Sequence, residues 1–157
     1  AAGAAAAIVV DSVETRLEIA RKMGATITLS VSTDNVSQII DLTGGSGVHV
    51  AFECAGAVPA MQAAIRVTRS GGIVQLVGMP AEQEPTVLLY DIIGRELQVQ
   101  GLFRYANTYP AAISLAAEGR VDLRSLVTKT FTLDEVPQAF HWVQEHREDV
   151  IKAVVRP

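Results

Sequence analysis

Four residues stand directly after apolar, β-branched runs, in the position where a ligand is expected. In a sheet of parallel strands covered by helices, ligands bind at the carboxyl ends of the strands. That rule selects Asp11, Cys54, Gly78 and Phe103. Asp11 carries the clearest chemistry, because a carboxylate at a strand end can accept hydrogen bonds from both hydroxyls of a ribose and repel a 2′-phosphate. Asp11 therefore favours NAD over NADP.

Two other interpretations of this region stay open. Asp11 can also cap the helix expected to begin near Val13, and the two roles are compatible. Arg16 can either pack its planar guanidinium against an adenine ring or lie on a solvated helix face. An arginine here slightly weakens the case against NADP.

Small residues follow the strand that ends near Glu53. The segment Glu53-Cys54-Ala55-Gly56 would let the backbone approach a ligand closely. For Cys54 itself we expect a small buried hydrophobic side chain rather than a reactive thiol. The runs Val77-Gly78-Met79 and Leu102-Phe103-Arg104-Tyr105 follow later strands in the same way.

Catalytic and metal-binding groups are not recognisable, so we expect no catalytic and no metal-binding residue in this chain. Zinc needs clustered Cys, His or carboxylate ligands, and the chain has a single cysteine. His141 and His146 would lie about 140° apart around a helix, so they could not bind the same metal ion. Both are expected at the surface or at the edge of the core. His49, within an apolar strand, is expected to be a core histidine. A Tyr-x-x-x-Lys pair is absent, as is a G-x-G-x-x-G loop ahead of Asp11.

Strand and helix patterns alternate along the chain. Runs of β-branched residues predict strands, and apolar residues at spacings of three and four predict helices. Strands are expected at 5–10, 26–29, 48–52, 73–77, 97–102, 127–131 and 151–155, and helices at 13–23, 34–42, 59 to about 70, 108–119 and from an N-cap at Asp134 to about 143. This alternation is typical of right-handed βαβ units, so the predicted class is α/β with a doubly wound parallel sheet.

Composition and charge limit the classes of function. With 157 residues, of which 49% are hydrophobic and 19% charged, the chain is expected to form one main domain with a large apolar core. A formal net charge of -4 without a basic cluster argues against nucleic acid and anionic membranes as partners. No apolar run approaches the roughly 20 residues of a membrane helix. The lone cysteine fits a reducing, cytoplasmic compartment.

Four segments of characteristic sequence are distributed between residues 8 and 113: I-V-V-D-S-V-E-T-R-L-E-I-A-R-K-M-G-A, F-E-C-A-G, T-R-S-G-G-I-V-Q-L-V-G-M and G-L-F-R-Y-A-N-T-Y-P-A-A-I. With them the chain resembles the carboxyl-terminal part of the zinc-dependent medium-chain dehydrogenases, and among these the polyol dehydrogenases of the sorbitol and xylitol type. The F-R-Y-x-N-T-x-P run, at this distance after V-G-M, is far more specific than a glycine pattern. It separates polyol dehydrogenases from simple alcohol dehydrogenases.

The resemblance implies an NAD site of the Rossmann type and assigns roles residue by residue. At the adenosine end, Asp11 would hold the ribose and Arg16 would lie beside the adenosine. Arg104 and Tyr105 would reach hydroxyls of a polyol substrate, although a structural ion pair with a carboxylate elsewhere is the alternative for Arg104. The residues that would line the cofactor cleft and approach the nicotinamide are Cys54, Ala55, Val77, Gly78, Met79, Leu102, Phe103 and Arg104.

The resemblance also implies the reaction and the parts that perform it. Hydride would pass from a secondary alcohol to NAD, with zinc acting on the hydroxyl as a Lewis acid through ligands that are not present here. Residues 1–150 would form a partial NAD-binding domain that lacks its first strand, the centre of a 3-2-1-4-5-6 sheet, and its glycine loop. Residues 151–157 would return to a catalytic domain. We expect a homo-oligomer as the intact enzyme, and no activity from this chain alone.

Three alternatives stay open. The first is a related dehydrogenase acting on threonine or a butanediol, against which the F-R-Y run argues. The second is a module that senses NAD or another nucleoside without catalysis, which would explain the missing zinc ligands. The third is a methyltransferase-like Rossmann domain, which does not explain V-G-M followed by F-R-Y.

Overall fold

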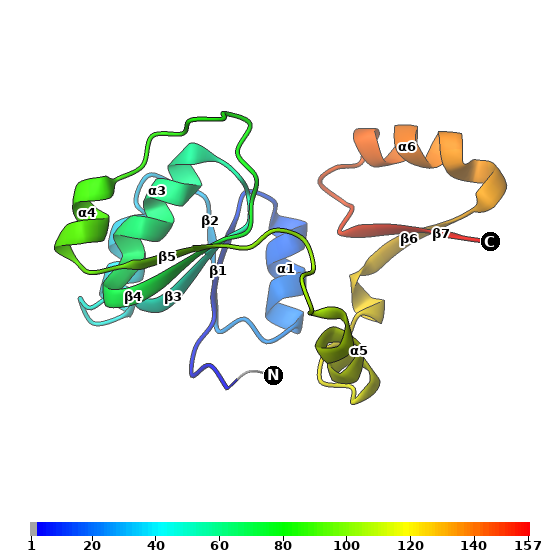
Figure 1. Cartoon of the computed structure of the whole chain (residues 1–157). Helices are drawn as coiled ribbons and strands as arrows, with labels where there is room; N and C mark the ends of the chain where they lie inside the picture. Colours follow the sequence, from blue (N-terminus) through cyan, green and yellow to red (C-terminus); the bar gives the residue numbers. More distant parts are fainter. Residues whose placement is uncertain (1–2) are drawn as a thin grey trace. The chain divides into compact units, whose positions relative to one another are not determined.

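The computed structural model describes residues 3–157, which form two compact units (Figure 1). One unit comprises the chain up to Val31 together with Asn107–Pro157, and the other comprises Ser32–Ala106. Each unit contains parallel strands with helices packed on them.

Three parallel strands form the sheet of the Ser32–Ala106 unit. Their order is β3 (Val48–Glu53), β4 (Thr68–Leu76), β5 (Gln98–Gly101). The helices of this unit are α2 (Asn35–Leu42), α3 (Val58–Val67) and α4 (Leu89–Gly94), and α3 packs on β3 and β4. In register, Glu53 pairs with Leu76 and Leu76 pairs with Gly101, so the three strands end at the same edge of the sheet.

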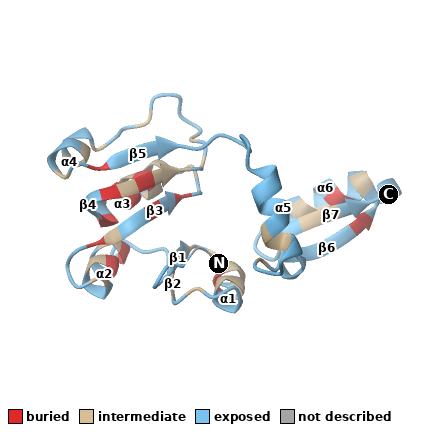
Figure 2. Ribbon diagram, turned by 60° about the horizontal axis from the view of Figure 1, so that its bottom comes forward, coloured by how far each residue is buried: buried red, intermediate tan, exposed pale blue. Residues whose placement is uncertain are grey.

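Helix α3 forms where proline and apolar spacing both favour a helix. Pro59 lies in the first turn, where its missing N–H costs no hydrogen bond. Ala64 and Ile65 follow Met61 at spacings of three and four residues, which places all three on one face of the helix, and all three are buried. Val74 of β4 is 0% exposed. Figure 2 shows buried residues gathered along α3 and the neighbouring strands, which form the core of this unit.

The carboxyl end of α3 is held by an arginine from beyond α4. The Arg95 guanidinium donates hydrogen bonds to the carbonyl oxygens of Ile65 at 2.7 Å, Arg66 at 3.2 Å and Thr68 at 2.7 Å. Arg95 also lies 3.6 Å from the carboxylate of Asp91. Because the last carbonyls of a helix have no partner within it, this guanidinium satisfies groups that would otherwise lack a donor.

The other unit begins with the parallel pair β1 (Ile8–Asp11) and β2 (Ile27–Ser30), joined by α1 (Glu14–Lys22). Leu17 of α1 is 1% exposed, and the helix packs on both strands. The unit continues with α5 (Tyr109–Ala117), β6 (Val127–Thr132), α6 (Val136–Glu145) and β7 (Lys152–Arg156), and with the short 3-10 helices η1 (Arg124–Leu126) and η2 (Leu133–Glu135). Strands β6 and β7 pair in parallel.

The predicted α/β class is confirmed, since every strand pair within residues 3–157 is parallel and helices alternate with the strands. No helix within residues 3–157 is long and apolar enough to cross a lipid bilayer.

Several boundaries differ from the prediction. Strand β1 begins at Ile8 rather than residue 5, α4 was not predicted, and β4 begins at Thr68 rather than residue 73. The early start of β4 includes Gly71 and Gly72, which directly follow the expected end of the preceding helix near residue 70. A register shift in its pairing with β3 accommodates this irregular stretch.

The predicted N-cap at Asp134 is wrong. Thr132 and Glu135 instead form a capping box around η2, and α6 begins at Val136 with Pro137 in its first turn. The Thr132 backbone N–H donates to Glu135 Oε2 at 2.7 Å and its hydroxyl donates to the same oxygen at 2.9 Å. These hydrogen bonds hold the pKa of Glu135 below its usual value, and the bond from the Thr132 backbone N–H has the larger effect.

Candidate functional site

The segments that follow β3, β4 and β5 are joined by backbone hydrogen bonds. The N–H groups of Val77 and Gly78 both donate to the carbonyl oxygen of Glu53, at 2.8 and 2.9 Å. The N–H of Leu102 donates to the carbonyl oxygen of Leu76 at 2.8 Å. We call segments 53–56, 77–79 and 102–105 the strand-end edge. It brings together all predicted cofactor and substrate residues except Asp11 and Arg16.

Two glycines allow close contact between segments 53–56 and 77–79. A Cβ on Gly78 would lie 2.1 Å from the backbone nitrogen of Gly56. A Cβ on Gly56, whose φ is +70°, would lie 2.3 Å from the carbonyl oxygen of Met79. Real Cβ atoms do not approach backbone atoms this closely, so the two segments meet backbone to backbone only because both positions are glycine.

Glu53 joins these two segments, and sequence reasoning did not select it as a site residue. Its side chain is 3% exposed, and Oε1 accepts hydrogen bonds from the N–H groups of Ala55 and Gly56, each at 2.8 Å. Oε2 is buried without a hydrogen-bond donor among residues 3–157. The available signal was a carboxylate as the last residue of a buried strand, directly followed by small residues.

Cys54 is exposed, so the prediction of a buried hydrophobic side chain is wrong. It follows the last residue of β3, where the chain leaves the sheet. Partial burial and the neighbouring charge of Glu53 raise the pKa of the Cys54 thiol. A raised pKa keeps the thiol protonated at neutral pH, which agrees with the prediction that Cys54 is not an activated nucleophile.

Segment 102–105 presents large side chains to solvent. Leu102, Phe103 and Tyr105 are all exposed, Phe103 by 64%. Arg104 has a left-handed backbone with φ of +59°, and its guanidinium lies 4.9 Å from the centre of the Phe103 ring. No salt bridge of Arg104 is present in residues 3–157, so the structural ion pair considered for it is not supported there. Left-handed residues other than glycine are uncommon and cluster at ligand sites.

Asp11 and Arg16 lie together at the carboxyl end of β1. Asp11 Oδ1 accepts a hydrogen bond from the N–H of Val13 at 2.9 Å, so the carboxylate fixes the turn into α1. Arg16 Nη1 lies 3.6 Å from the same oxygen, and Arg16 Nη2 donates to the carbonyl oxygen of Arg147 at 3.1 Å. Arg16 therefore turns back toward the strand end rather than extending from the helix face.

The histidines and carboxylates do not assemble a metal centre. Within residues 3–157, no group of three or more His, Cys, Asp or Glu side chains could hold a metal ion. His141 is exposed, and His146 stacks on Trp142 with ring centres 4.3 Å apart, which agrees with their predicted surface and core-edge positions. His49 was predicted to lie in the core and is exposed, because burial along β3 begins only at Ala51.

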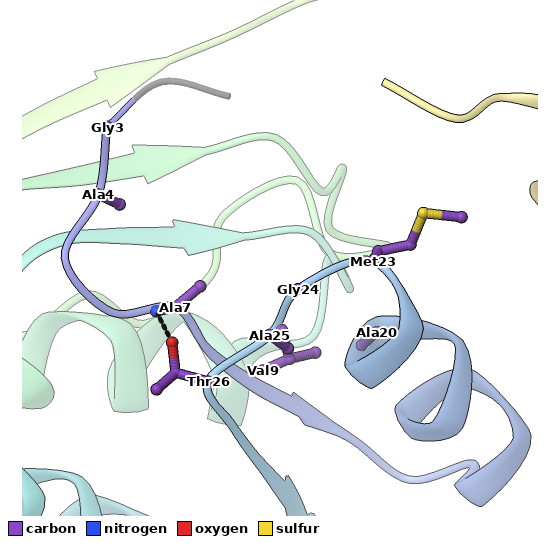
Figure 3. A pocket seen from close by; sticks show the side chains of 9 residues that line it. All are labelled: Gly3, Ala4, Ala7, Val9, Ala20, Met23, Gly24, Ala25 and Thr26. Carbon is purple, nitrogen blue, oxygen red and sulfur yellow. Dashed lines mark hydrogen bonds between the residues drawn. The ribbon is translucent and has the colours of Figure 1, made fainter. Parts of the chain in front are cut away.

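A hollow of about 490 Å³ lies at the opposite end of β1 from Asp11 (Figure 3). Its rim includes Ala7, whose N–H donates to the hydroxyl of Thr26 at 3.0 Å. The lining consists of Gly3, Ala4, Ala7, Val9, Ala20, Met23, Gly24, Ala25 and Thr26. None of these side chains is ionisable, and the hollow lies at the amino end of the strand, so it is not the candidate site.

The strand-end edge can bind a flat, partly apolar ligand. It offers backbone groups around Gly56 and Gly78, apolar surface from Met79 and Phe103, and one cation at Arg104. Such a mixture of apolar surface and a few polar groups is typical of cofactor sites.

The known proteins that this chain resembles in sequence are dehydrogenases. The family model for zinc-binding dehydrogenases matches residues 1–118. The sorbitol dehydrogenase of Bacillus subtilis is 37% identical over 156 residues, which are 99% of this chain and 44% of that protein. Human sorbitol dehydrogenase is 40% identical over 143 residues, 89% of this chain and 40% of that protein. The chain thus spans less than half the length of these relatives.

Solved structures agree with these sequence matches. The 2R,3R-butanediol dehydrogenase of Bacillus subtilis matches with a TM-score of 0.89 at 31% identity, over 99% of this chain and 45% of that chain. A protein described as a zinc-binding dehydrogenase from Sinorhizobium meliloti, bound to NADP, matches with a TM-score of 0.85 at 29% identity, over 99% of this chain and 46% of that chain.

Proposed function

The chain belongs to the zinc-binding dehydrogenase family, and from this premise we propose that it is the NAD-binding part of a polyol dehydrogenase. The intact enzyme would transfer hydride from a secondary alcohol of sorbitol, xylitol or a similar polyol to NAD. In this oxidation NAD would accept the hydride of the carbinol carbon and the hydroxyl proton would be released to solvent, so that the products would be a ketose, NADH and a proton.

The strand-end edge is the observation that carries this proposal. Segments 53–56 and 77–79 meet backbone to backbone at Gly56 and Gly78, and Cys54 and Ala55 lie directly before Gly56 in the chain. We assign the nicotinamide half of NAD to this edge, where Val77, Gly78 and Met79 approach it through their backbone. When bound, NAD supplies the hydride acceptor. Leu102, Phe103 and Arg104 would cover the ring.

We assign the adenosine ribose to Asp11, with Arg16 beside the adenosine. The Asp11 carboxylate favours NAD because it would repel a 2′-phosphate. NADP is the second candidate, since Arg16 lies 3.6 Å from this carboxylate and a structural relative is bound to NADP. An arginine beside the ribose is the group that accommodates a 2′-phosphate in this class of fold.

We assign the polyol hydroxyls to Arg104 and Tyr105, both exposed on the strand-end edge. The names of the sorbitol dehydrogenase relatives support this substrate class. A related alcohol is the alternative, because one structural relative is a butanediol dehydrogenase. A non-catalytic module that senses NAD is the alternative outside enzymes.

Residues 3–157 hold no cluster that fits zinc, so we derive no step through a metal from them. We propose that the zinc ligands lie outside this chain, that residues 1–150 form a partial NAD-binding domain, and that 151–157 return toward a catalytic domain. Within the described residues, these last residues pair with β6 through β7. The intact enzyme is proposed to be a cytoplasmic homo-oligomer that acts on a small molecule and binds neither nucleic acid nor membrane.

The test uses the protein as its gene encodes it, with sorbitol, xylitol or 2,3-butanediol as the alcohol. It measures formation of NADH with NAD as cofactor and of NADPH with NADP. We expect kcat/KM for a polyol with NAD to exceed the values with butanediol or NADP by about tenfold or more. A preference for butanediol or NADP would favour the corresponding alternative. NAD binding without turnover of any alcohol would favour the sensor, and absence of NAD binding would contradict the proposal.

A further inference from the structure

Glu53 makes hydrogen bonds with both segments that form the centre of the strand-end edge. Its Oε1 accepts from the N–H groups of Ala55 and Gly56, and its backbone carbonyl accepts from those of Val77 and Gly78. These four donors belong to the loops that follow β3 and β4. A displacement of Glu53 would therefore move both loops.

The position of Glu53 is unfavourable for a residue with only a packing role. Its side chain is 3% exposed, and Oε2 has no donor among the described residues. A buried carboxylate oxygen without a hydrogen bond is destabilising, and such groups in folded proteins call for a functional explanation. An apolar side chain of similar size would fill the same space without this cost.

The carboxylate also lies against the contact between the two loops. A Cβ on Gly78 would lie 2.7 Å from Glu53 Oε2, and 2.1 Å from the nitrogen of Gly56, which itself donates to Glu53 Oε1. The carboxylate, Gly56 and Gly78 thus form one packed contact beneath the segments assigned to the nicotinamide half.

We propose that Glu53 is a positioning residue of the cofactor site, whose Oε1 holds segment 54–56 against segment 77–79 in the arrangement that receives the nicotinamide half of NAD. This inference rests on the proposed function. Asp11 and Arg16, assigned to the adenosine half, make their hydrogen bonds and ion pair with Val13, Arg147 and each other. Glu53 therefore acts on the nicotinamide half of the ligand and not on the adenosine half.

The test measures the dissociation constants of NAD and of ADP-ribose, which lacks the nicotinamide, by calorimetric titration. It uses the whole protein that the gene encodes. Glu53→Leu removes the acceptor, and we expect Kd for NAD to rise about tenfold or more while Kd for ADP-ribose stays within about twofold. Glu53→Gln retains an amide oxygen at Oε1 and is expected to keep Kd for NAD within about threefold of the original protein. Glu84→Leu, at an exposed glutamate of the same unit, is the control and should change neither Kd.

Thermal melting of each variant identifies those that fold. If Glu53→Leu does not fold, Glu53→Met replaces it, because its side chain has a similar length but no oxygen to accept from the two N–H groups, and the same selective loss of NAD binding is expected. Equal weakening of NAD and ADP-ribose would show a general structural role and overturn the proposal, as would unchanged NAD binding. If the original protein binds neither ligand, the proposed function fails before any variant is measured, and the role of Glu53 fails with it.

Discussion

Asp11 lies at the end of β1, and its Oδ1 contacts both the N–H of Val13 and the guanidinium of Arg16. Asp11→Asn keeps an oxygen for the Val13 hydrogen bond but removes the charge that repels a 2′-phosphate. We expect the ratio of kcat/KM with NAD to that with NADP to fall by roughly tenfold, about 1.4 kcal/mol. Steady-state kinetics with both cofactors measures this ratio.

The control for Asp11 is Glu14→Gln at the start of α1, the helix that follows β1. Glu14 is an exposed carboxylate paired with Arg21 at 2.8 Å, so its removal changes the net charge equally. The ratio should stay unchanged in this variant. An Asp11→Asn protein that keeps the original ratio would show that Asp11 serves only the turn into α1.

Cys54 provides a pH test, since burial and the charge of Glu53 raise its pKa. The thiolate is the reactive form, so a raised pKa lowers its fraction at neutral pH and shifts alkylation to higher pH. We expect iodoacetamide to modify Cys54 more slowly in the folded protein than in urea at the same pH. Residues 1–157 contain only this cysteine, so mass spectrometry of its peptide reports the site. Faster alkylation of the folded protein would contradict the raised pKa.

At the residue scale, sequence reasoning located the strand ends but not the exposure of their side chains. Cys54 and His49 were expected to be buried because their neighbours are apolar, yet both are exposed. Glu53 was not selected because its contact with segment 77–79, which is distant in sequence, has no signature in the residues around it. The left-handed backbone of Arg104 has no signature in the residue type.

The contact between the β3 and β4 loops is a property of elements, and Gly78 tests it. Gly78→Ala places a Cβ 2.1 Å from the nitrogen of Gly56, so the loops must separate. We expect the free energy of unfolding to fall by about 1–3 kcal/mol and Kd for NAD to rise. Urea denaturation and calorimetry measure the two effects.

Gly94→Ala is the matched control for Gly78→Ala. A Cβ on Gly94 would meet no atom within 4 Å, and Gly94 ends α4. Its replacement should leave stability unchanged or slightly increased, because alanine reduces the entropy of the unfolded chain. Equal effects of the two substitutions would argue against a tight contact at Gly78.

Arg95 tests how α3 is held at its carboxyl end. Arg95→Met removes hydrogen bonds to the carbonyl oxygens of Ile65, Arg66 and Thr68 while retaining apolar bulk. We expect the free energy of unfolding to fall by about 2 kcal/mol in urea denaturation. Arg66→Met changes an exposed side chain on the same helix and should have little effect. A comparable loss in both variants would show that the carbonyl contacts are not the cause.

At the element scale, local periodicity was sufficient for the alternation of strands and helices. Apolar spacing located α3 and β-branched runs located β3 and β6, because these patterns reflect one buried face. Helix α4 was not predicted because it has only six residues and none of them is buried, so it leaves no periodic apolar pattern. The start of α6 was misplaced because Asp134 and Thr132 are both residues that favour an N-cap, and the Glu135 hydrogen bonds decide between them.

At the scale of the whole molecule, the chain spans 44% of the Bacillus subtilis sorbitol dehydrogenase and 40% of the human one. Asp11 belongs to one compact unit and the strand-end edge to the other. We therefore expect residues 1–157 alone to bind NAD more weakly than the protein as its gene encodes it, and to oxidise no polyol with added zinc. Measurable turnover by residues 1–157 alone would contradict the assignment of the catalytic groups to other parts of the protein.

The most direct test of the cofactor assignment is amide hydrogen exchange of the protein as its gene encodes it, with and without saturating NAD. With NAD we expect slower exchange in segments 53–56, 77–79 and 102–105 and around Asp11. With ADP-ribose we expect protection only around Asp11. Protection confined to other segments, or equal protection by both ligands, would contradict the assignment of the nicotinamide half to the strand-end edge.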